Sequence, residues 1–297
     1  MKILITGASG FVGSNFAQRR LIHGDDIVAI TRPTTDETFL PRGVRIFRYS
    51  DDHEQLSEFI QSERFDGIVH LATHFCAMHT VPDIDKLIES NIRFGTHLFE
   101  AVTKHAVPWI VNTSSYTQHY NNQEYSPANL YSAMKQAFED IVQYYAETAK
   151  TTILTVTLFD TIGAGDRRSK ILHALLESAK TGKQLALSPG EQLLDISPIQ
   201  NILDGYDRML TLLAASDHAF LREKVFALPS NERMTLRSFV ALFEEVLGRK
   251  IPVQFGARSY RDREMMLPWT HGDVVPGWKP SLTLAESIRD IIKTELG

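Results

Sequence analysis

Tyr131 and Lys135 lie four residues apart in a stretch with helical spacing. On a helix, positions i and i+4 share one face, so the phenol and the ammonium group would be neighbours. A nearby ammonium group favours the phenolate and lowers the pKa of a tyrosine. Such a phenol can act as a general acid or base near neutral pH. The pair is therefore a candidate for proton transfer, but without a second signal it would indicate only a pair on a helix surface.

Two serines follow the apolar run at residues 109–113. Ser114 and Ser115 would then stand at the carboxyl end of a strand. In an open parallel sheet this edge faces the ligand crevice, where a hydroxyl group could hydrogen-bond a substrate carbonyl. The alternative is a polar cluster that serves only the turn after the strand.

Three equally spaced glycines, Gly7, Gly10 and Gly13, follow the first apolar run of the chain. They would connect a strand at residues 2–6 to a helix at 12–23. The N-terminus of a helix offers free N–H groups and a positive dipole end to a pyrophosphate. Glycines allow the tight turn and the close approach of the backbone that such binding needs. The G-x-x-G-x-x-G spacing differs from the usual fingerprint, but its position predicts a dinucleotide site rather than a plain strand–helix turn.

The end of the second expected strand indicates which dinucleotide binds. Sites for dinucleotides without a 2′-phosphate usually carry an acidic residue there. Here Thr31 and Arg32 stand at that point, with no carboxylate. A guanidinium group can hold a 2′-phosphate through two hydrogen bonds. We therefore expect NADP(H) rather than NAD(H), with a solvated surface arginine as the alternative.

The elements that must position these residues alternate between strand and helix. This rhythm predicts an α/β fold, a Rossmann-type doubly wound parallel sheet with helices on both faces. The strands are expected at residues 2–6, 26–31, 44–47, 67–72, 109–113 and 152–159, and the helices at 12–23, 56–63, 84–105 and 131–149.

The rhythm loosens after residue 160. Further helices are expected at 169–181, 199–215, 236–247 and 282–296, and short strands at 225–228 and 253–255. We expect an NADP-binding domain over residues 1–160, with a returning segment near 192–215. Residues 161–297 would form mainly a smaller C-terminal α/β substrate lobe.

Composition excludes several classes of protein. The 297 residues carry 31 basic and 36 acidic side chains, a net charge of −5, so we expect no nucleic-acid partner. No run approaches the ~20 apolar residues of a membrane span, and no targeting segment is visible. The single cysteine, Cys76, allows no internal disulfide, which fits a reducing compartment. A cytoplasmic protein without a membrane partner is the expectation.

Three histidines and Cys76 lie close together in the sequence, at His70, His74 and His79. These residue types are good zinc ligands. However, the segment begins in an expected buried strand and continues into a loop, so no ligand geometry follows from it. We expect no metal here or elsewhere in the chain, and expect His74 or His79 to line a substrate pocket.

Taken together, these motifs resemble the extended short-chain dehydrogenase/reductases of the NAD-dependent epimerase/dehydratase family. The order of glycine turn, strand-end serine, tyrosine and lysine is that of the family, and the resemblance covers essentially the whole chain. Finer stretches resemble the CDP-abequose and CDP-paratose synthases, at residues 28–32, 67–73, 112–113, 189–192, 255–257 and 261–266. The resemblance implies NADPH-dependent reduction of a nucleotide-linked 4-keto sugar for bacterial surface polysaccharide, such as the O-antigen of lipopolysaccharide.

The resemblance also implies roles for individual residues. Tyr131 would protonate the C4 alkoxide, and Lys135 would hold the nicotinamide ribose. Ser115 best matches the catalytic hydroxyl of the family, with Ser114 as the alternative. The cofactor site would comprise Gly7, Ser9, Gly10, Phe11, Val12, Gly13, Thr31, Arg32, Asp51, Leu71, Ala72, Thr73, Asn91, Thr113, Tyr131, Lys135 and Phe159.

The substrate site implied by the resemblance draws on both halves of the chain. It would comprise His74, His79, Ser115, Asp160, Lys170 and Arg261. Arg261 matches an arginine that clamps the nucleotide diphosphate in the family; a surface salt bridge to its acidic neighbours is the alternative. Lys170, with Arg167 and Arg168, could meet phosphate or form a solvated cluster. A homodimer is expected from the resemblance.

Two other functions remain open. One is an epimerase or dehydratase that retains NAD. The missing acid of the second strand opposes it, as do Tyr116 and Thr117, which stand where a dehydratase usually has Asp-Glu. The other is a non-catalytic NADP(H)-binding regulator, which would have no need of the Tyr131–Lys135 pair. The nucleotide base, the sugar and the configuration at C4 stay undetermined by the sequence.

Overall fold

The computed structural model describes residues 1–215 and 219–297. Within these residues, eight strands form one sheet in the order β14-β11-β6-β5-β4-β1-β2-β3, and every neighbouring pair is parallel. The strand order reverses between β1 and β4, as in a doubly wound fold, so the expected fold class is confirmed. The strands of this sheet are β1 (Lys2–Thr6), β2 (Asp26–Thr31), β3 (Arg45–Arg48), β4 (Gly67–His70), β5 (Trp109–Ser115), β6 (Thr152–Leu158), β11 (Val225–Leu228) and β14 (Asp273–Val274).

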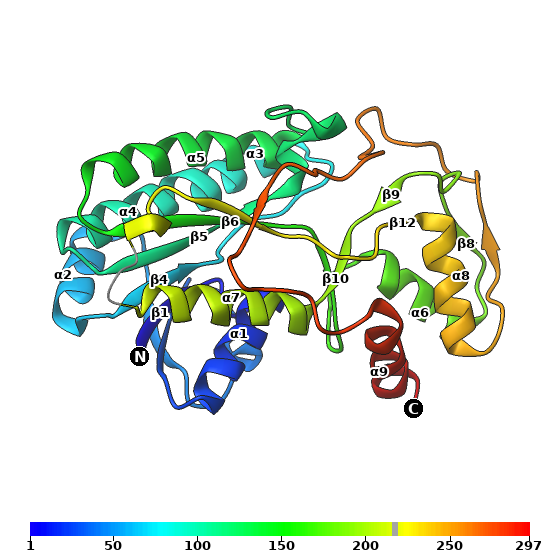
Figure 1. Ribbon diagram of the computed structural model, residues 1–297, viewed down its shortest axis with the longest axis horizontal. Coiled ribbons are helices and arrows are strands. Elements are labelled where there is room, and N and C mark those ends of the chain that lie inside the picture. The colour runs from blue at the N-terminus through cyan, green and yellow to red at the C-terminus, as the bar shows by residue number, and fades with distance from the viewer. Residues whose placement is uncertain (216–218) are drawn as a thin grey trace.

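Helices cover both faces of the sheet (Figure 1). Ile3 and Ile5 of β1 belong to the core under α1 and α7, whereas Leu4 belongs to the core under α2, α4 and α5. Because successive strand residues point to opposite faces, an uninterrupted apolar run is what a strand buried on both sides requires. The covering helices are α1 (Phe11–Ile22), α2 (His53–Glu63), α4 (Phe94–Lys104), α5 (Leu130–Thr148) and α7 (Ile199–Leu213).

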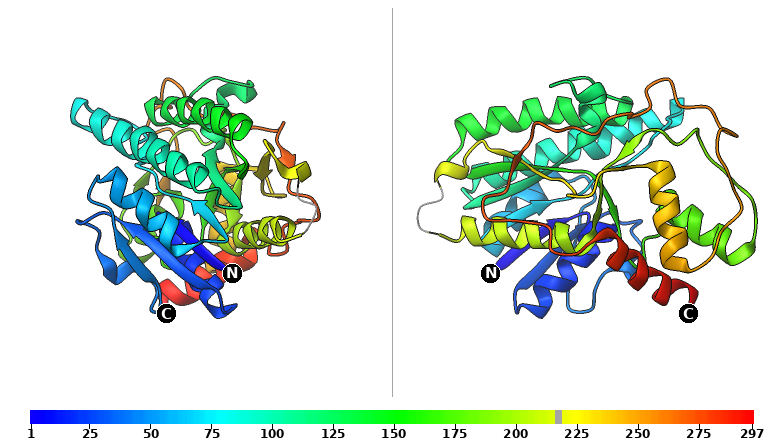
Figure 2. Two further views of the ribbon diagram at one scale, coloured as in Figure 1. Left: turned by 90° about the vertical axis from the view of Figure 1, so that its left-hand side faces the viewer. Right: turned by 45° about the vertical axis from the view of Figure 1, so that its right-hand side comes forward.

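A second lobe stands beside the sheet, at the right of Figure 1 and turned forward in the right-hand view of Figure 2. Its helices α6 (Ile171–Thr181), α8 (Leu236–Leu247) and α9 (Leu284–Leu296) enclose a third apolar core. Three short strand pairs complete it: β7 (Asp160–Ile162) with β10 (Ile196–Pro198), β9 (Leu193–Leu194) with β12 (Met234–Thr235), and β8 (Leu185–Ala186) with β13 (Val253–Gln254).

The helix expected over residues 84–105 differs in one respect. The structure has α3 (Val81–Ile88), then a π-helical turn at Glu89–Arg93, and then α4. The three pieces follow one another without a break, because the residues between them keep α-helical backbone angles. A π-helical turn inserts an extra residue and rotates the side chains around it, and such turns are frequent at functional sites.

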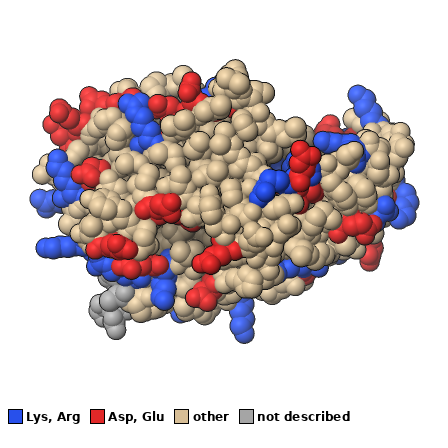
Figure 3. Space-filling view, turned by 90° about the horizontal axis from the view of Figure 1, so that it is seen from above, with Lys and Arg blue, Asp and Glu red and all other residues tan. Residues whose placement is uncertain are grey.

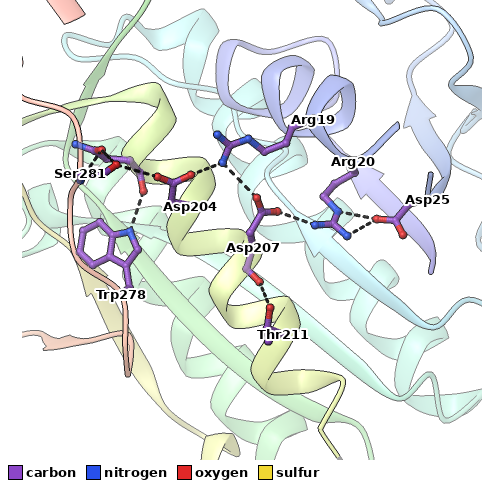
Figure 4. A network of polar contacts seen from close by, with 9 residues as sticks. Arg19, Arg20, Asp25, Asp204, Asp207, Thr211, Trp278 and Ser281 are labelled. Carbon is purple, nitrogen blue, oxygen red and sulfur yellow. Dashed lines mark hydrogen bonds and ion pairs between the residues drawn. The ribbon is translucent and has the colours of Figure 1, made fainter. Parts of the chain in front are cut away.

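A network of charges holds α1 against α7 (Figure 4). Arg19 contacts Asp204 at 2.6 Å and Asp207 at 3.2 Å. Arg20 bridges Asp207 at 2.8 Å and the loop residue Asp25 at 2.5 Å. Hydrogen bonds between charged groups are about twice as strong as those between neutral groups. The network therefore fixes the helix whose N-terminus follows the glycine turn.

Charges of both signs are interspersed on the face seen in Figure 3. On this face no continuous basic field is present of the kind that a nucleic-acid backbone attracts. In the described part of the chain, no helix is long and apolar enough to cross a lipid bilayer.

Candidate active site

A cleft of about 2030 Å³ lies where the carboxyl ends of the sheet strands meet the second lobe. A pocket for one small ligand usually measures about 300–1,000 Å³, so this cleft has room for two ligands together. The residues predicted from the sequence that line it are Gly7, Ser9, Gly10, Phe11, Val12, Gly13, Thr31, Arg32, Asp51, Leu71, Ala72, Thr73, His74, His79, Thr113, Ser115, Tyr131, Lys135, Phe159, Asp160, Lys170 and Arg261. Asn91 is the predicted site residue that does not line the cleft.

The glycine turn is built for close approach. Gly7 has a φ of +75°, and a Cβ added there would lie 2.7 Å from the nitrogen of Ala72. A Cβ at Gly13 would lie 2.2 Å from the carbonyl oxygen of Gly7. Gly10 precedes α1 without a side-chain cap, and the first turn of that helix contains no acidic residue. The positive end of α1 is thus left for an anion, so the turn fits a dinucleotide pyrophosphate.

Arg32 directly follows β2 and lines the cleft. The backbone N–H of Arg32 donates to Thr35 Oγ1 at 3.0 Å, which fixes the start of its loop. Among the described residues, no acidic group or carbonyl pairs with its guanidinium group, which lines the cleft. The hydroxyl of Thr31 beside it is buried and has no hydrogen-bond partner. These donors fit a phosphate on the adenosine ribose.

Arg167 reaches from the second lobe to the same half of the cleft. Its guanidinium carbon lies 3.2 Å from the centroid of the Phe39 ring, and Nη2 lies 3.4 Å from the carbonyl oxygen of Ser9 in the glycine turn. The sequence placed Arg167 only in a basic cluster with Lys170. In the structure Lys170 instead pairs with Asp160.

The tyrosine and one of the two serines meet at the end of β5. The phenol of Tyr131 lies beside the side chains of Ser115 and Thr73, both of which favour its ionised form. Ser115 Oγ also lies 2.8 Å from Thr117 Oγ1. Ser114 points away from the phenol, because its buried hydroxyl lies against Gln118 Oε1 and Glu139 Oε1 and donates to one of them. The geometry therefore places Ser115, and not Ser114, beside the phenol in the cleft.

Lys135 lies one turn after Tyr131 on α5 and is almost fully buried. Its ammonium group donates to the carbonyl oxygen of Thr113 at 2.9 Å. Burial lowers the pKa of Lys135 to about 8, and the nearby carboxylate of Glu139 opposes this change. Its proton is thus less firmly held than that of an exposed lysine.

The pKa of Tyr131 moves opposite to the direction expected from its spacing to Lys135. Burial raises this pKa, and the hydrogen bonds with Thr73 and Ser115 only oppose the increase. Loss of hydration disfavours a phenolate more than these contacts favour it. The phenol is therefore kept protonated at neutral pH, which is the form that donates a proton.

Asn91 lies in the π-helical turn and is buried, and its side chain holds Thr73 and His74 in place. Its Oδ1 accepts from Thr73 Oγ1 at 2.8 Å and from the His74 backbone N–H at 2.8 Å. Its Nδ2 donates to the carbonyl oxygen of His74 at 3.0 Å. The expectation that Asn91 itself lines the cofactor site is not met, because the π-helical turn aims its side chain at this loop.

The three neighbouring histidines of the sequence do not converge. His70 is buried in the core, with Nδ1 2.7 Å from Thr6 Oγ1, and burial lowers its pKa to about 3. His74 and His79 line the cleft. Phe75 between them packs edge-on against the Tyr131 ring, with centroids 5.0 Å apart. The sequence analysis missed Phe75, although its place in the crevice loop was the available signal.

The substrate half of the cleft holds a charged group on the second lobe. Asp160 accepts from Lys170 at 2.6 Å and from the Tyr116 hydroxyl at 3.1 Å. Burial opposes ionisation of Asp160, but the charge and hydrogen bonds of its partners keep its pKa below the usual range. Arg261 lines the cleft, and within the described ranges it contacts an acidic neighbour through its backbone N–H, which donates to Glu264 at 3.3 Å, and not through its side chain. The expected alternative, a salt bridge with its acidic neighbours, is therefore not formed.

Sequence comparison gives the same picture. The model of the NAD-dependent epimerase/dehydratase family matches residues 3–220. A CDP-abequose synthase of Salmonella typhimurium is 23% identical over 98% of this chain and 97% of its own length. A UDP-glucose 4-epimerase of Corynebacterium glutamicum is 23% identical over 95% and 92%.

Solved structures show the same fold. The UDP-glucuronic acid 4-epimerase of Bacillus cereus, in complex with UDP-glucuronic acid and NAD, superposes with a TM-score of 0.85 at 19% identity. The match covers 100% of this chain and 99% of that one. The resemblance found in the sequence is thus confirmed, and the chain belongs to the NAD-dependent epimerase/dehydratase family.

Proposed function

We propose that this protein uses NADPH to reduce the C4 ketone of a nucleoside-diphosphate-4-keto-6-deoxy or 3,6-dideoxy sugar, with CDP-linked sugars as the first candidates. The observation that carries the proposal is the contact of Tyr131 with Ser115, one helical turn from the buried Lys135, in a cleft with room for a dinucleotide and a second ligand. The similarity to CDP-abequose synthases supports the substrate class. We also propose that the product is used for the synthesis of bacterial surface polysaccharide. We further propose that the protein forms a homodimer.

Each residue of the site has a task in this reaction. The glycine turn and Arg32 hold the phosphates of NADPH, which supplies the hydride when bound. Ser115 donates a hydrogen bond to the C4 carbonyl oxygen, which orients the ketone and stabilises the charge that develops on oxygen. Tyr131 donates its proton to that oxygen. The buried Lys135 ammonium group supports loss of the proton from the phenol.

The substrate diphosphate needs cations at the other end of the cleft. Arg261 is free to supply them, and a guanidinium group matches a diphosphate through paired hydrogen bonds. Lys170 is held by Asp160 at 2.6 Å and so presents a charge that is already partly balanced. We assign the diphosphate to Arg261 and the sugar to the side of the cleft near Asp160.

The main rival is an epimerase or dehydratase with retained NAD, which the family relationship and the structural similarities leave open. Two features favour the reductase. Arg32 stands unpaired where NAD enzymes usually have an acid. The residue after Ser115 is Tyr116, whose hydroxyl donates to Asp160, so no carboxylate stands beside the serine for proton abstraction.

The deciding experiment follows NADPH oxidation with a panel of nucleotide-linked 4-keto-6-deoxy sugars, CDP-linked first, with NADH as the comparison. Turnover with one member supports the reductase, and NMR of the product gives the configuration at C4. Binding of NADPH without turnover on any member would contradict the proposed substrate class. Tightly held NAD in the purified protein would favour the epimerase or dehydratase.

Replacing Arg32 by alanine is expected to weaken NADPH binding by about 10- to 100-fold, because charged hydrogen bonds contribute about 1.5–3 kcal/mol. NADH has no 2′-phosphate, so its affinity should stay the same. Fluorescence titration with both nucleotides measures the difference. Arg42→Ala, at another exposed arginine, is the control. An equal loss for NADH and NADPH would show that Arg32 does not recognise the phosphate.

A further inference from the structure

Three possible metal ligands meet behind the adenosine end of the cleft. Asp51 follows β3, His53 begins α2, and His97 lies in α4. One ligand atom from each lies within 4.8 Å of the other two. We propose that Asp51, His53 and His97 form a binding site for a divalent transition-metal ion, with Zn²⁺ as the best match. Two imidazoles and one carboxylate are a donor set that suits zinc.

Nδ1 of His53 lies 2.8 Å from the hydroxyl oxygen of Tyr49, which also lies 3.3 Å from Asp51 Oδ1. The tyrosine hydroxyl has one proton, and the tautomer of His53 decides which of the two contacts receives it. A histidine that binds a metal usually donates its other ring N–H to a partner that fixes the ring. In the tautomer with the proton on Nδ1, Tyr49 is that partner, and Nε2 keeps its lone pair for a metal ion.

The imidazole of His97 has a buried nitrogen atom without a hydrogen-bond partner. Its Nδ1 is shielded from solvent and makes no hydrogen bond. A buried polar atom without a partner is costly, and such atoms are rare. The ring of His97 lies against that of His53, with centroids 3.3 Å apart and planes 39° apart.

One carboxylate oxygen of Asp51 is available to bind a metal ion. Its Oδ2 accepts from Arg93 at 2.8 Å, and Arg93 is balanced in turn by Glu89 at 2.9 Å. The contact of Oδ1 with Tyr49 is long, so this oxygen can turn to an ion while Arg93 keeps the carboxylate in place. Three protein ligands leave a fourth tetrahedral position, which is accessible because Asp51 is exposed.

The site is separate from the Ser115–Tyr131–Lys135 group and does not depend on the proposed reaction. Asp51 also lines the cleft, so an ion would engage a residue of the adenosine end. The proposal departs from the expectation that the chain binds no metal. His53 and His97 are distant in the sequence and belong to different helices, so residue spacing in the sequence could not indicate this metal site.

The test uses the full chain without a histidine tag, stripped with EDTA and then dialysed. Titration with Co²⁺ should produce the visible absorption of a tetrahedral complex, and a single equivalent of Zn²⁺ should abolish it. His53→Ala and His97→Ala should each weaken zinc binding by more than about tenfold, and Tyr49→Phe should weaken it less, because the ligands remain. His173→Ala, at an exposed histidine of α6, is the matched control.

Each result decides the proposal. Saturable binding that His53→Ala and His97→Ala weaken, and His173→Ala does not, supports it. Absence of saturable binding overturns it, as does zinc affinity that is unchanged in both variants. Thermal unfolding checks that the variants fold. If either alanine variant is unfolded, His97→Gln, which keeps a polar side chain of similar reach, takes its place and must also lose zinc.

Discussion

Tyr131→Phe is expected to lower kcat by about 100- to 10,000-fold, the usual contribution of a positioned proton donor. The phenol ring, its burial and its edge contact with Phe75 would remain. Only the hydroxyl that contacts Ser115 and Thr73 is lost. NADPH binding should persist, because the glycine turn and Arg32 are unchanged. Steady-state NADPH oxidation and a separate titration with NADPH measure the two effects.

Tyr144→Phe is the matched control for this variant, since Tyr144 lies on the same helix and is 61% exposed. It should leave kcat and NADPH affinity unchanged. If Tyr131→Phe retained full turnover, another group would have to donate the proton, and the assignment of the site would be wrong. If it lost NADPH binding together with turnover, the phenol would serve the cofactor rather than the proton.

Lys135→Met is expected to abolish most activity and yet to stabilise the fold at neutral pH. The difference between a pKa of about 8 and the ordinary 10.5 of a lysine corresponds to about 3 kcal/mol, the cost of keeping this charge buried. Methionine fills the same space without a charge. Loss of the hydrogen bond to Thr113 and of the charge near Glu139 offsets part of the gain, so we expect a net increase of about 1 kcal/mol in the free energy of unfolding.

The stability gain from Lys135→Met is expected to depend on pH. Between pH 8 and 10.5 the unfolded chain binds more protons at Lys135 than the folded chain, so the stability of the wild type rises with pH in this window. The advantage of Lys135→Met should therefore be largest at or below about pH 8 and shrink above it. Urea unfolding at several pH values measures this, with Lys150→Met, at an exposed lysine, as the control. A variant less stable than the wild type at neutral pH would contradict the account.

Local sequence patterns predicted much of the fold and of the site. The apolar run of β1, the glycine turn after it and the helix that carries Tyr131 each depend on residues close in sequence. For the same reason, most predicted site residues line the cleft. Parallel strands bring their carboxyl ends to one edge of the sheet, so residues that follow strands meet there.

Features that depend on tertiary packing could not be predicted from the sequence. The raised pKa of Tyr131 follows from its burial, which its spacing to Lys135 does not reveal. The direction of the Asn91 side chain depends on a π-helical turn inside an otherwise regular helix. The choice between Ser114 and Ser115 depends on Glu139, which draws Ser114 away from the cleft. In each case the deciding partner gave no signal in the local sequence.

The charge network between α1 and α7 has a consequence for how the protein is made. Phe16 of α1 packs against Tyr206 of α7, with ring centroids 5.4 Å apart, and Arg19 is anchored by Asp204. During synthesis the helix after the glycine turn therefore leaves the ribosome long before its covering helix. Until then α1 alone covers one face of the sheet and β6 is an open edge, because α7 and β11 have not been made. Such surfaces are prone to aggregation, so a chain interrupted near residue 160 would leave a fragment in need of chaperones rather than a small nucleotide-binding protein.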